Sequence, residues 1–135
     1  MVRNIYKKIT ALAAALAVAG CATLYNPATG RNERILINSA AEVAIGQNAA
    51  KELNRKQTIS TGNRMAIRVS EVGRRVAAVS DRQDIEYKFS IIEDKELNAF
   101  TFPGGFVYVN KGLVVLLNED ELAYVLGHEV GHAAA

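Results

Sequence analysis

The segment His128-Glu129-Val130-Gly131-His132 restricts the fold of this chain more than any other, because it contains both histidines of the sequence. The residues before it predict a helix. Asn118 is a favoured N-cap, Glu121 stands three residues later, and the acidic residues of this first turn suit the helix dipole. Successive residues of an α-helix are rotated by about 100°, so residues four apart lie about 40° apart. We therefore expect both imidazoles on one face of a helix.

Two imidazoles at this spacing are typical of a zinc site. His128 and His132 can ligate one Zn²⁺, and Glu129 lies close enough to act as the general base for a water molecule that the metal activates. The sequence therefore predicts a Zn²⁺ cofactor, with His128 and His132 as metal ligands and Glu129 as the catalytic residue. The alternative is a surface helix with two incidental histidines.

The N-terminal twenty residues have the pattern of a secretory signal peptide. Arg3, Lys7 and Lys8 precede a 12-residue apolar stretch, Ile9 to Gly20. A bilayer span needs about 20 apolar residues, so this stretch is too short to cross a membrane and fits the core of a signal peptide. The alternative is an alanine-rich buried helix. Residues 1–20 are therefore predicted to be a signal peptide.

Cys21 follows the apolar stretch directly and is the only cysteine of the chain. Val18-Ala19-Gly20-Cys21 resembles the bacterial lipobox, in which the cysteine receives lipid and becomes the new N-terminus. A lone cysteine is otherwise most often a small buried hydrophobic residue. We expect a lipidated Cys21, a tether over residues 21–38, and a location in the bacterial cell envelope facing the periplasm. Because Ala22 is not aspartate, the resemblance implies anchoring in the outer membrane.

The charge of the chain argues against a nucleic-acid partner. The formal net charge is +2, from 16 basic and 14 acidic residues, but residues 1–20 contain three of the basic residues and no acidic one. The remaining 13 basic and 14 acidic residues give the rest of the chain a net charge of −1. This balance excludes the default interpretation of a basic chain, which is nucleic-acid binding.

Residues 39–135 alternate between helical and strand patterns and are expected to form the folded domain. Ser39 and Glu42 match a capping box, and alternating apolar and polar side chains over residues 85–91 indicate a half-buried strand. The expected elements are a helix from Ser39 to about Arg55, a helix over residues 65–79, strands over residues 85–91, 98–102 and 106–109 with a turn at 103–105, a short helix over 113–117, and the helix after Asn118. This order predicts an α+β fold.

The stretch from Asn98 to His132 resembles a known family of metallopeptidases. The family includes the membrane heat-shock protease HtpX, the mitochondrial protease Oma and the CAAX-prenyl endopeptidase, and the chain is most similar to its bacterial periplasmic lipoprotein members. The segments that carry the resemblance are Asn98-Ala99-Phe100, Pro103-Gly104-Gly105, Val107-Tyr108-Val109, Gly112-Leu113, Glu119-Asp120-Glu121-Leu122-Ala123 and Leu126-Gly127-His128-Glu129-Val130-Gly131-His132.

The resemblance implies a zincin-like domain, with helices packed on a small mixed sheet. It implies hydrolysis of peptide bonds in unfolded or misassembled envelope proteins by a lipid-anchored enzyme. Asn98, Ala99 and Phe100 would lie on a strand beside the cleft, where an extended substrate could pair with the backbone. Core packing is an equally good explanation of Phe100 and Phe102.

In this family the third zinc ligand is a glutamate on a helix downstream of the second histidine. The chain has three residues after His132. We therefore expect residues 39–135 to be the N-terminal portion of the metallopeptidase domain, incomplete at the C-terminus and inactive alone. Two alternatives are a non-catalytic envelope assembly factor or chaperone-like lipoprotein, and a truncated product without a stable fold.

Overall fold

The computed structural model describes residues 23–26, 31–34 and 38–135, in two units that divide after residue 37. The predicted signal peptide and Cys21 lie outside the described residues. In the first unit, β1 (Thr23–Asn26) and β2 (Arg31–Arg34) pair antiparallel, with Thr23 opposite Arg34. Both strands lie within residues 21–38, the predicted tether, which stays a prediction.

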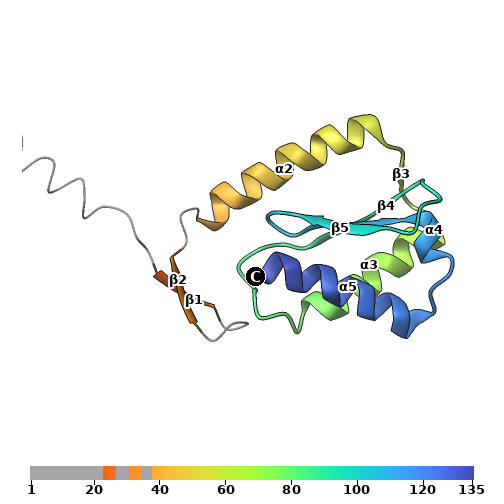
Figure 1. The fold of residues 1–135 in the computed structure, drawn as a ribbon. Helices are drawn as coiled ribbons and strands as arrows, with labels where there is room; N and C mark the ends of the chain where they lie inside the picture. The colour runs from red at the N-terminus through yellow and green to blue at the C-terminus, as the bar shows by residue number, and fades with distance from the viewer. Residues whose placement is uncertain (1–22, 27–30, 35–37) are drawn as a thin grey trace, which may run out of the picture. The chain divides into compact units, whose positions relative to one another are not determined.

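The second unit is a small mixed sheet with helices on both faces (Figure 1). Its elements are α2 (Ser39–Lys56), β3 (Ile59–Ser60), α3 (Arg64–Ala77), β4 (Lys88–Ile92), β5 (Ala99–Phe102), β6 (Phe106–Asn110), α4 (Lys111–Val114) and α5 (Glu119–Ala134). The strand order is β3-β4-β6-β5, in which β4 and β6 are parallel and the other pairs are antiparallel. The predicted α+β class, with helices on a small mixed sheet, is confirmed.

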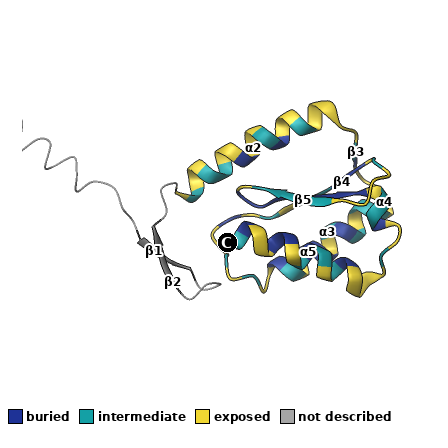
Figure 2. Ribbon diagram, in the orientation of Figure 1, coloured by how far each residue is buried: buried dark blue, intermediate teal, exposed yellow. Residues whose placement is uncertain are grey.

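The larger hydrophobic core lies between the sheet and the two helices α3 and α5. Alternate residues of β4 and β6 point toward these helices, so their side chains pack between the strands and the apolar stripe of each helix. Figure 2 shows buried residues along both helices and along the strands of the sheet. The fully enclosed members are Val69, Val72, Ile91, Val107, Val109, Val114, Leu122 and Leu126. This core fixes α5 to the sheet and so determines where its histidine segment lies.

A second, smaller core lies between the opposite face of the sheet and α2. Ala50 of α2 packs with Phe106 and Tyr108 of β6. Gly46 brings the helix close to the β5–β6 turn, since a Cβ at this position would lie only 1.6 Å from the Pro103 carbonyl oxygen. At the turn itself, Gly104 and Gly105 have φ angles of +82° and +89°, a backbone conformation that glycine adopts without steric cost.

Asparagine side chains cap the starts of α2, α3 and α5. The capping box of Asn118 and Glu121 at the start of α5 is confirmed, with both reciprocal hydrogen bonds present. The capping box predicted for Ser39 is wrong: Asn38 caps α2 by accepting from the Ala41 amide. The Glu42 side chain instead bonds to groups from other parts of the fold.

The strand predicted over residues 85–91 begins later, at Lys88. Ile85 is buried, as its apolar character indicated, but residues 85–87 pair with no described strand because the parallel register of β4 with β6 starts at Lys88 opposite Phe106. The helix predicted to reach Val79 ends at Ala77, and Val79 is 84% exposed. Both errors concern element ends, where local periodicity does not record the tertiary partner.

Among the helices of the described residues, none combines the length and the apolar character needed to cross a bilayer.

Candidate functional site

His128 and His132 lie one turn apart on the exposed side of α5. Their Nε2 atoms are 3.0 Å apart, and the two rings are nearly perpendicular, at 87°. Two nitrogens that bind one tetrahedral zinc at about 2.0–2.1 Å are separated by about 3.3 Å. The two imidazoles therefore already converge as a pair of ligands to one metal ion would.

The donor set fits zinc in type and spacing but is incomplete within the described residues. Neutral imidazole nitrogens are common zinc ligands, and a catalytic zinc has three protein ligands and one open position. Residues 38–135 contain no group of three or more histidine, cysteine, aspartate or glutamate side chains placed to hold a metal ion. His128 and His132 can thus supply two of the three protein ligands.

Glu129 is rotated around α5 by about 100° from His128 and about 60° from His132, toward the core, and is only 7% exposed. Its position follows from the spacing of the buried residues of this helix, which are Leu122, Leu126, Glu129, Val130 and Ala133. Residues three and four apart form one stripe, so the same periodicity that seats α5 on the sheet also carries Glu129 inward. A buried carboxylate requires a hydrogen-bond partner.

Thr101 of β5 is that partner. Its Oγ1 lies 2.7 Å from Glu129 Oε2 and 3.2 Å from the Glu129 carbonyl oxygen, so the hydroxyl can donate to the carboxylate. Thr101 is not among the predicted site residues. The sequence did contain a signal for it. Residues two apart share one face of a strand, so Thr101 places a hydroxyl on the same face as the apolar Ala99.

The predicted substrate strand is an edge strand of the sheet, but it begins one residue later than predicted. β5 pairs only with β6 among the described strands, and it lies beside α5 (Figure 1). The strand begins at Ala99, so Asn98 precedes it, and the Asn98 carbonyl accepts from the Asn110 amide at 2.9 Å. The roles of Asn98, Ala99 and Phe100 in substrate binding stay predictions.

The backbone groups that β5 leaves free follow from this hydrogen bond. In an antiparallel pair, hydrogen-bonded positions alternate with positions whose N–H and C=O point outward. Because Asn98 is bonded to Asn110, the next bonded positions on β5 are Phe100 and Phe102, opposite Tyr108 and Phe106. Ala99 and Thr101 therefore direct their backbone groups to the open edge.

Phe100 and Phe102 point away from α5, to the face that α2 covers. Their rings lie 5.4 Å apart, and each lies within 5.6 Å of the Tyr108 ring. The Tyr108 hydroxyl bonds to Asn54 of α2. The pKa of this phenol is raised, because the effect of burial exceeds the opposite effect of the Asn54 hydrogen bond. These contacts agree with core packing, one of the two explanations given above for Phe100 and Phe102.

Arg82 links the C-terminal end of α5 to the start of α2. Its guanidinium donates to the Ala133 carbonyl oxygen at 3.1 Å and to Glu42 Oε1 at 3.0 Å. The hydrogen bond with Glu42 raises the pKa of Arg82 against the opposing effect of burial, and Asp84 raises it further. Glu42 Oε1 also accepts from the Gly104 amide at 3.1 Å, so one cluster ties α2, α5 and the β5–β6 turn together.

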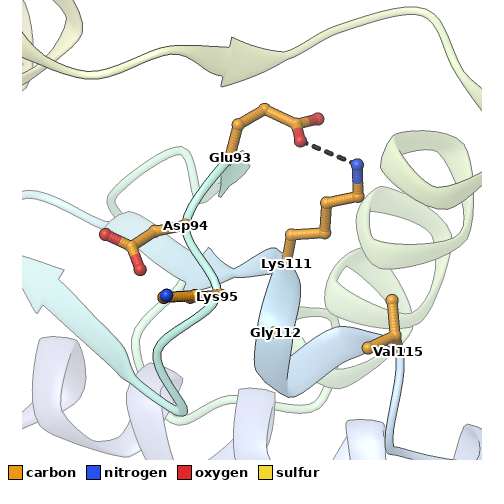
Figure 3. Close-up of a pocket in the computed structure, with 6 residues that line it drawn as sticks. All are labelled: Glu93, Asp94, Lys95, Lys111, Gly112 and Val115. Atoms are coloured by element: carbon orange, nitrogen blue, oxygen red, sulfur yellow. Dashed lines mark hydrogen bonds and ion pairs between the residues drawn. The ribbon is translucent and has the colours of Figure 1, made fainter.

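A separate pocket of about 320 Å³ contains none of these residues. It lies between the segment that follows β4 and the short helix α4 (Figure 3). Lys111 spans its wall and pairs with Glu93 at 2.8 Å, and the hydrogen bond from Lys111, with that from Ser60, lowers the pKa of Glu93. The pocket is thus walled by a satisfied ion pair and has no connection with the histidine segment of α5.

The chain is similar to several known metalloproteases. It is 34% identical to the mitochondrial metalloendopeptidase OMA1 of Schizosaccharomyces pombe, over 82% of this chain and 34% of that protein. It is 28% identical to the metalloprotease LoiP of Escherichia coli, over 94% of this chain and 54% of that protein. A putative beta-barrel assembly-enhancing protease of Vibrio cholerae is 35% identical over 47% of this chain and 13% of that protein.

The chain spans about a third of the length of OMA1 and about half of the length of LoiP. Residues 63–135, which include α3, the strands of the site and α5, match Peptidase family M48. The relatives named above are themselves described as metalloendopeptidase, metalloprotease and protease. The chain therefore belongs to Peptidase family M48.

Proposed function

We propose that this chain carries the catalytic helix of a zinc-dependent endopeptidase of the bacterial cell envelope. One observation carries the proposal: α5 presents the two Nε2 atoms 3.0 Å apart and, from the next residue, a carboxylate that β5 holds in place. Membership of Peptidase family M48 supports a metal-binding and hydrolytic role for this arrangement.

Each residue has a distinct task in this proposal. His128 and His132 bind the metal, and the free backbone groups of β5 pair with an extended peptide. Glu129 accepts a proton from the attacking water and transfers it toward the leaving amine. Zinc, when bound, supplies a Lewis acid that makes water nucleophilic near neutral pH.

The resemblance implies that a glutamate on a later helix completes the metal site. The described residues supply two ligands, so we expect the 135-residue chain to bind zinc weakly and to hydrolyse little substrate. Robust cleavage by this chain with added zinc would mean that another of its residues acts as the third ligand.

Loss of an outer-shell partner weakens metal binding by about 10- to 100-fold. His132→Ala removes a direct ligand, so we expect it to weaken zinc binding by more than this. Competition against a chromogenic chelator measures the affinity. Glu129→Gln is the matched control and should keep the wild-type affinity, since Glu129 is not assigned as a ligand. Equal affinity of the His132→Ala variant and the wild type would exclude the histidine pair as the zinc site.

We propose unfolded or misassembled envelope proteins as substrates. An edge strand recognises any extended backbone, which unfolded chains expose and folded proteins do not. The names of some relatives, such as the beta-barrel assembly-enhancing proteases of Vibrio cholerae and Escherichia coli, support a setting in the envelope.

The location is proposed to be the outer membrane, through a lipid on Cys21 and facing the periplasm. Cys21→Ser is expected to abolish palmitate labelling and to release the protein from the membrane fraction, because a serine hydroxyl does not replace the thiol in lipid transfer. Cys21→Ala serves as a second variant without any hydroxyl. Unchanged membrane association of both variants would contradict the anchor.

A further inference from the structure

We propose that Thr101 is a positioning residue, which holds the Glu129 carboxylate in the orientation needed for proton transfer. The inference rests on the proposed function of Glu129 as general base. It adds a residue of the edge strand β5 to the machinery, outside the His128–His132 segment.

The contact is short and charge-assisted. Thr101 Oγ1 lies 2.7 Å from Glu129 Oε2, within the range for a hydroxyl that donates to a carboxylate. The distance from Oγ1 to the Glu129 carbonyl oxygen is longer, 3.2 Å, so the carboxylate is the better acceptor of the single hydroxyl proton. Among the described residues, Thr101 makes the side-chain hydrogen bond of this carboxylate.

The two side chains differ in stiffness, and this gives Thr101 its effect. Glutamate has three rotatable side-chain bonds, and fixing such a side chain costs up to about 1.5–2 kcal/mol in conformational entropy. Threonine is β-branched and stiff at χ1. Thr101 is also anchored by its strand, since its neighbour on β6 is the fully buried Val107. A rigid donor therefore restrains a flexible acceptor.

The hydrogen bond engages one carboxylate oxygen, Oε2, and leaves Oε1 to accept the proton from water. The backbone groups of Thr101 point to the open edge of β5, where an extended substrate would pair. Removing the hydroxyl alters neither these backbone groups nor the two histidines. The inference thus predicts a loss in kcat with little change in KM.

The test compares Thr101→Val, which keeps the side-chain shape without the hydroxyl, with Thr101→Ser, which keeps the hydroxyl, in the protein expressed from its complete gene. We expect Thr101→Val to lower kcat by about 10- to 100-fold, as loss of an outer-shell partner does, with unchanged KM and zinc content. Thr101→Ser should retain most of the wild-type kcat. The control is Thr61→Val, an exposed threonine before α3, which should have no effect.

A measurement that needs no turnover tests the contact itself in the 135-residue chain. With ¹³C-labelled glutamate Cδ, the Glu129 resonance is assigned from its absence in Glu129→Gln. It should move in Thr101→Val and stay near its wild-type position in Thr101→Ser and Thr61→Val. Circular dichroism of each variant shows whether the fold is kept.

The inference is overturned if Thr101→Val keeps the wild-type kcat, if Thr101→Ser loses as much activity as Thr101→Val, or if the Glu129 resonance does not move in Thr101→Val. Failure of the proposed function has a different signature. It would be seen as full proteolysis by Glu129→Gln, which removes the base itself, whatever the Thr101 variants do.

Discussion

Glu129→Gln is expected to lower the kcat for casein hydrolysis by about 10²- to 10⁴-fold, the contribution typical of a positioned general base. Glutamine has nearly the same shape as glutamate, and its carbonyl oxygen can still accept the hydrogen bond from Thr101. It cannot accept a proton from water near neutral pH. The zinc content and the unfolding midpoint should therefore stay close to those of the wild type while turnover is lost.

The matched control is Glu119→Gln, the same substitution at the first residue of α5. Glu119 is exposed and pairs with Arg75, whose hydrogen bond lowers the pKa of this carboxyl. Glu119→Gln should leave kcat unchanged, since the carboxyl lies more than two turns from the histidines. Proteolysis retained in Glu129→Gln would contradict the base assignment and would favour the alternative of a non-catalytic assembly factor.

Leu126→Ala is expected to lower the free energy of unfolding by about 2–5 kcal/mol, the range measured for leucine truncation in cores. Leu126 is 0% exposed and belongs to the core that seats α5 against α3 and the sheet. The truncation removes packing on one side of the helix and leaves a cavity. Since small domains are stable by only about 5–15 kcal/mol, this is a large share of the total.

Urea unfolding followed by far-ultraviolet circular dichroism measures the change. Leu116→Ala makes the same chemical change at a side chain that is 65% exposed, in the segment before α5, and should alter the unfolding free energy little. Equal destabilisation by the two substitutions would mean that Leu126 is not enclosed as the structure has it. A larger loss for Leu126 alone would support the packing of α5 that places the histidines.

Several parts of the fold could be predicted from neighbouring residues. The start of α5 at the Asn118–Glu121 capping box and the β5–β6 hairpin with its two turn glycines depend on contacts within a few residues along the chain. Local hydrogen bonds and backbone preferences are set by the neighbouring residues, so such elements can be predicted from the sequence. The facing of His128 and His132 is of the same kind, because helical rotation alone brings them together.

Other features depended on partners far along the chain. Ser39 and Glu42 do not form the predicted capping box, because Ser39 bonds to Asp84 and Glu42 bonds to Arg82 and to the Gly104 amide, 40 and 62 residues from Glu42. The start of β4 follows from its parallel pairing with β6, and no periodicity within residues 85–91 records that register.

The sequence by itself determined the helix, the facing of its two histidines and the carboxylate next to the first of them. Only the tertiary structure decided that Glu129 is buried and that Thr101, 28 residues earlier, donates to it. The physical reason lies in the range of each interaction. Helical geometry acts over four residues, whereas the burial of Glu129 and its hydrogen bond exist only once the core of α3, α5 and the sheet brings β5 beside α5.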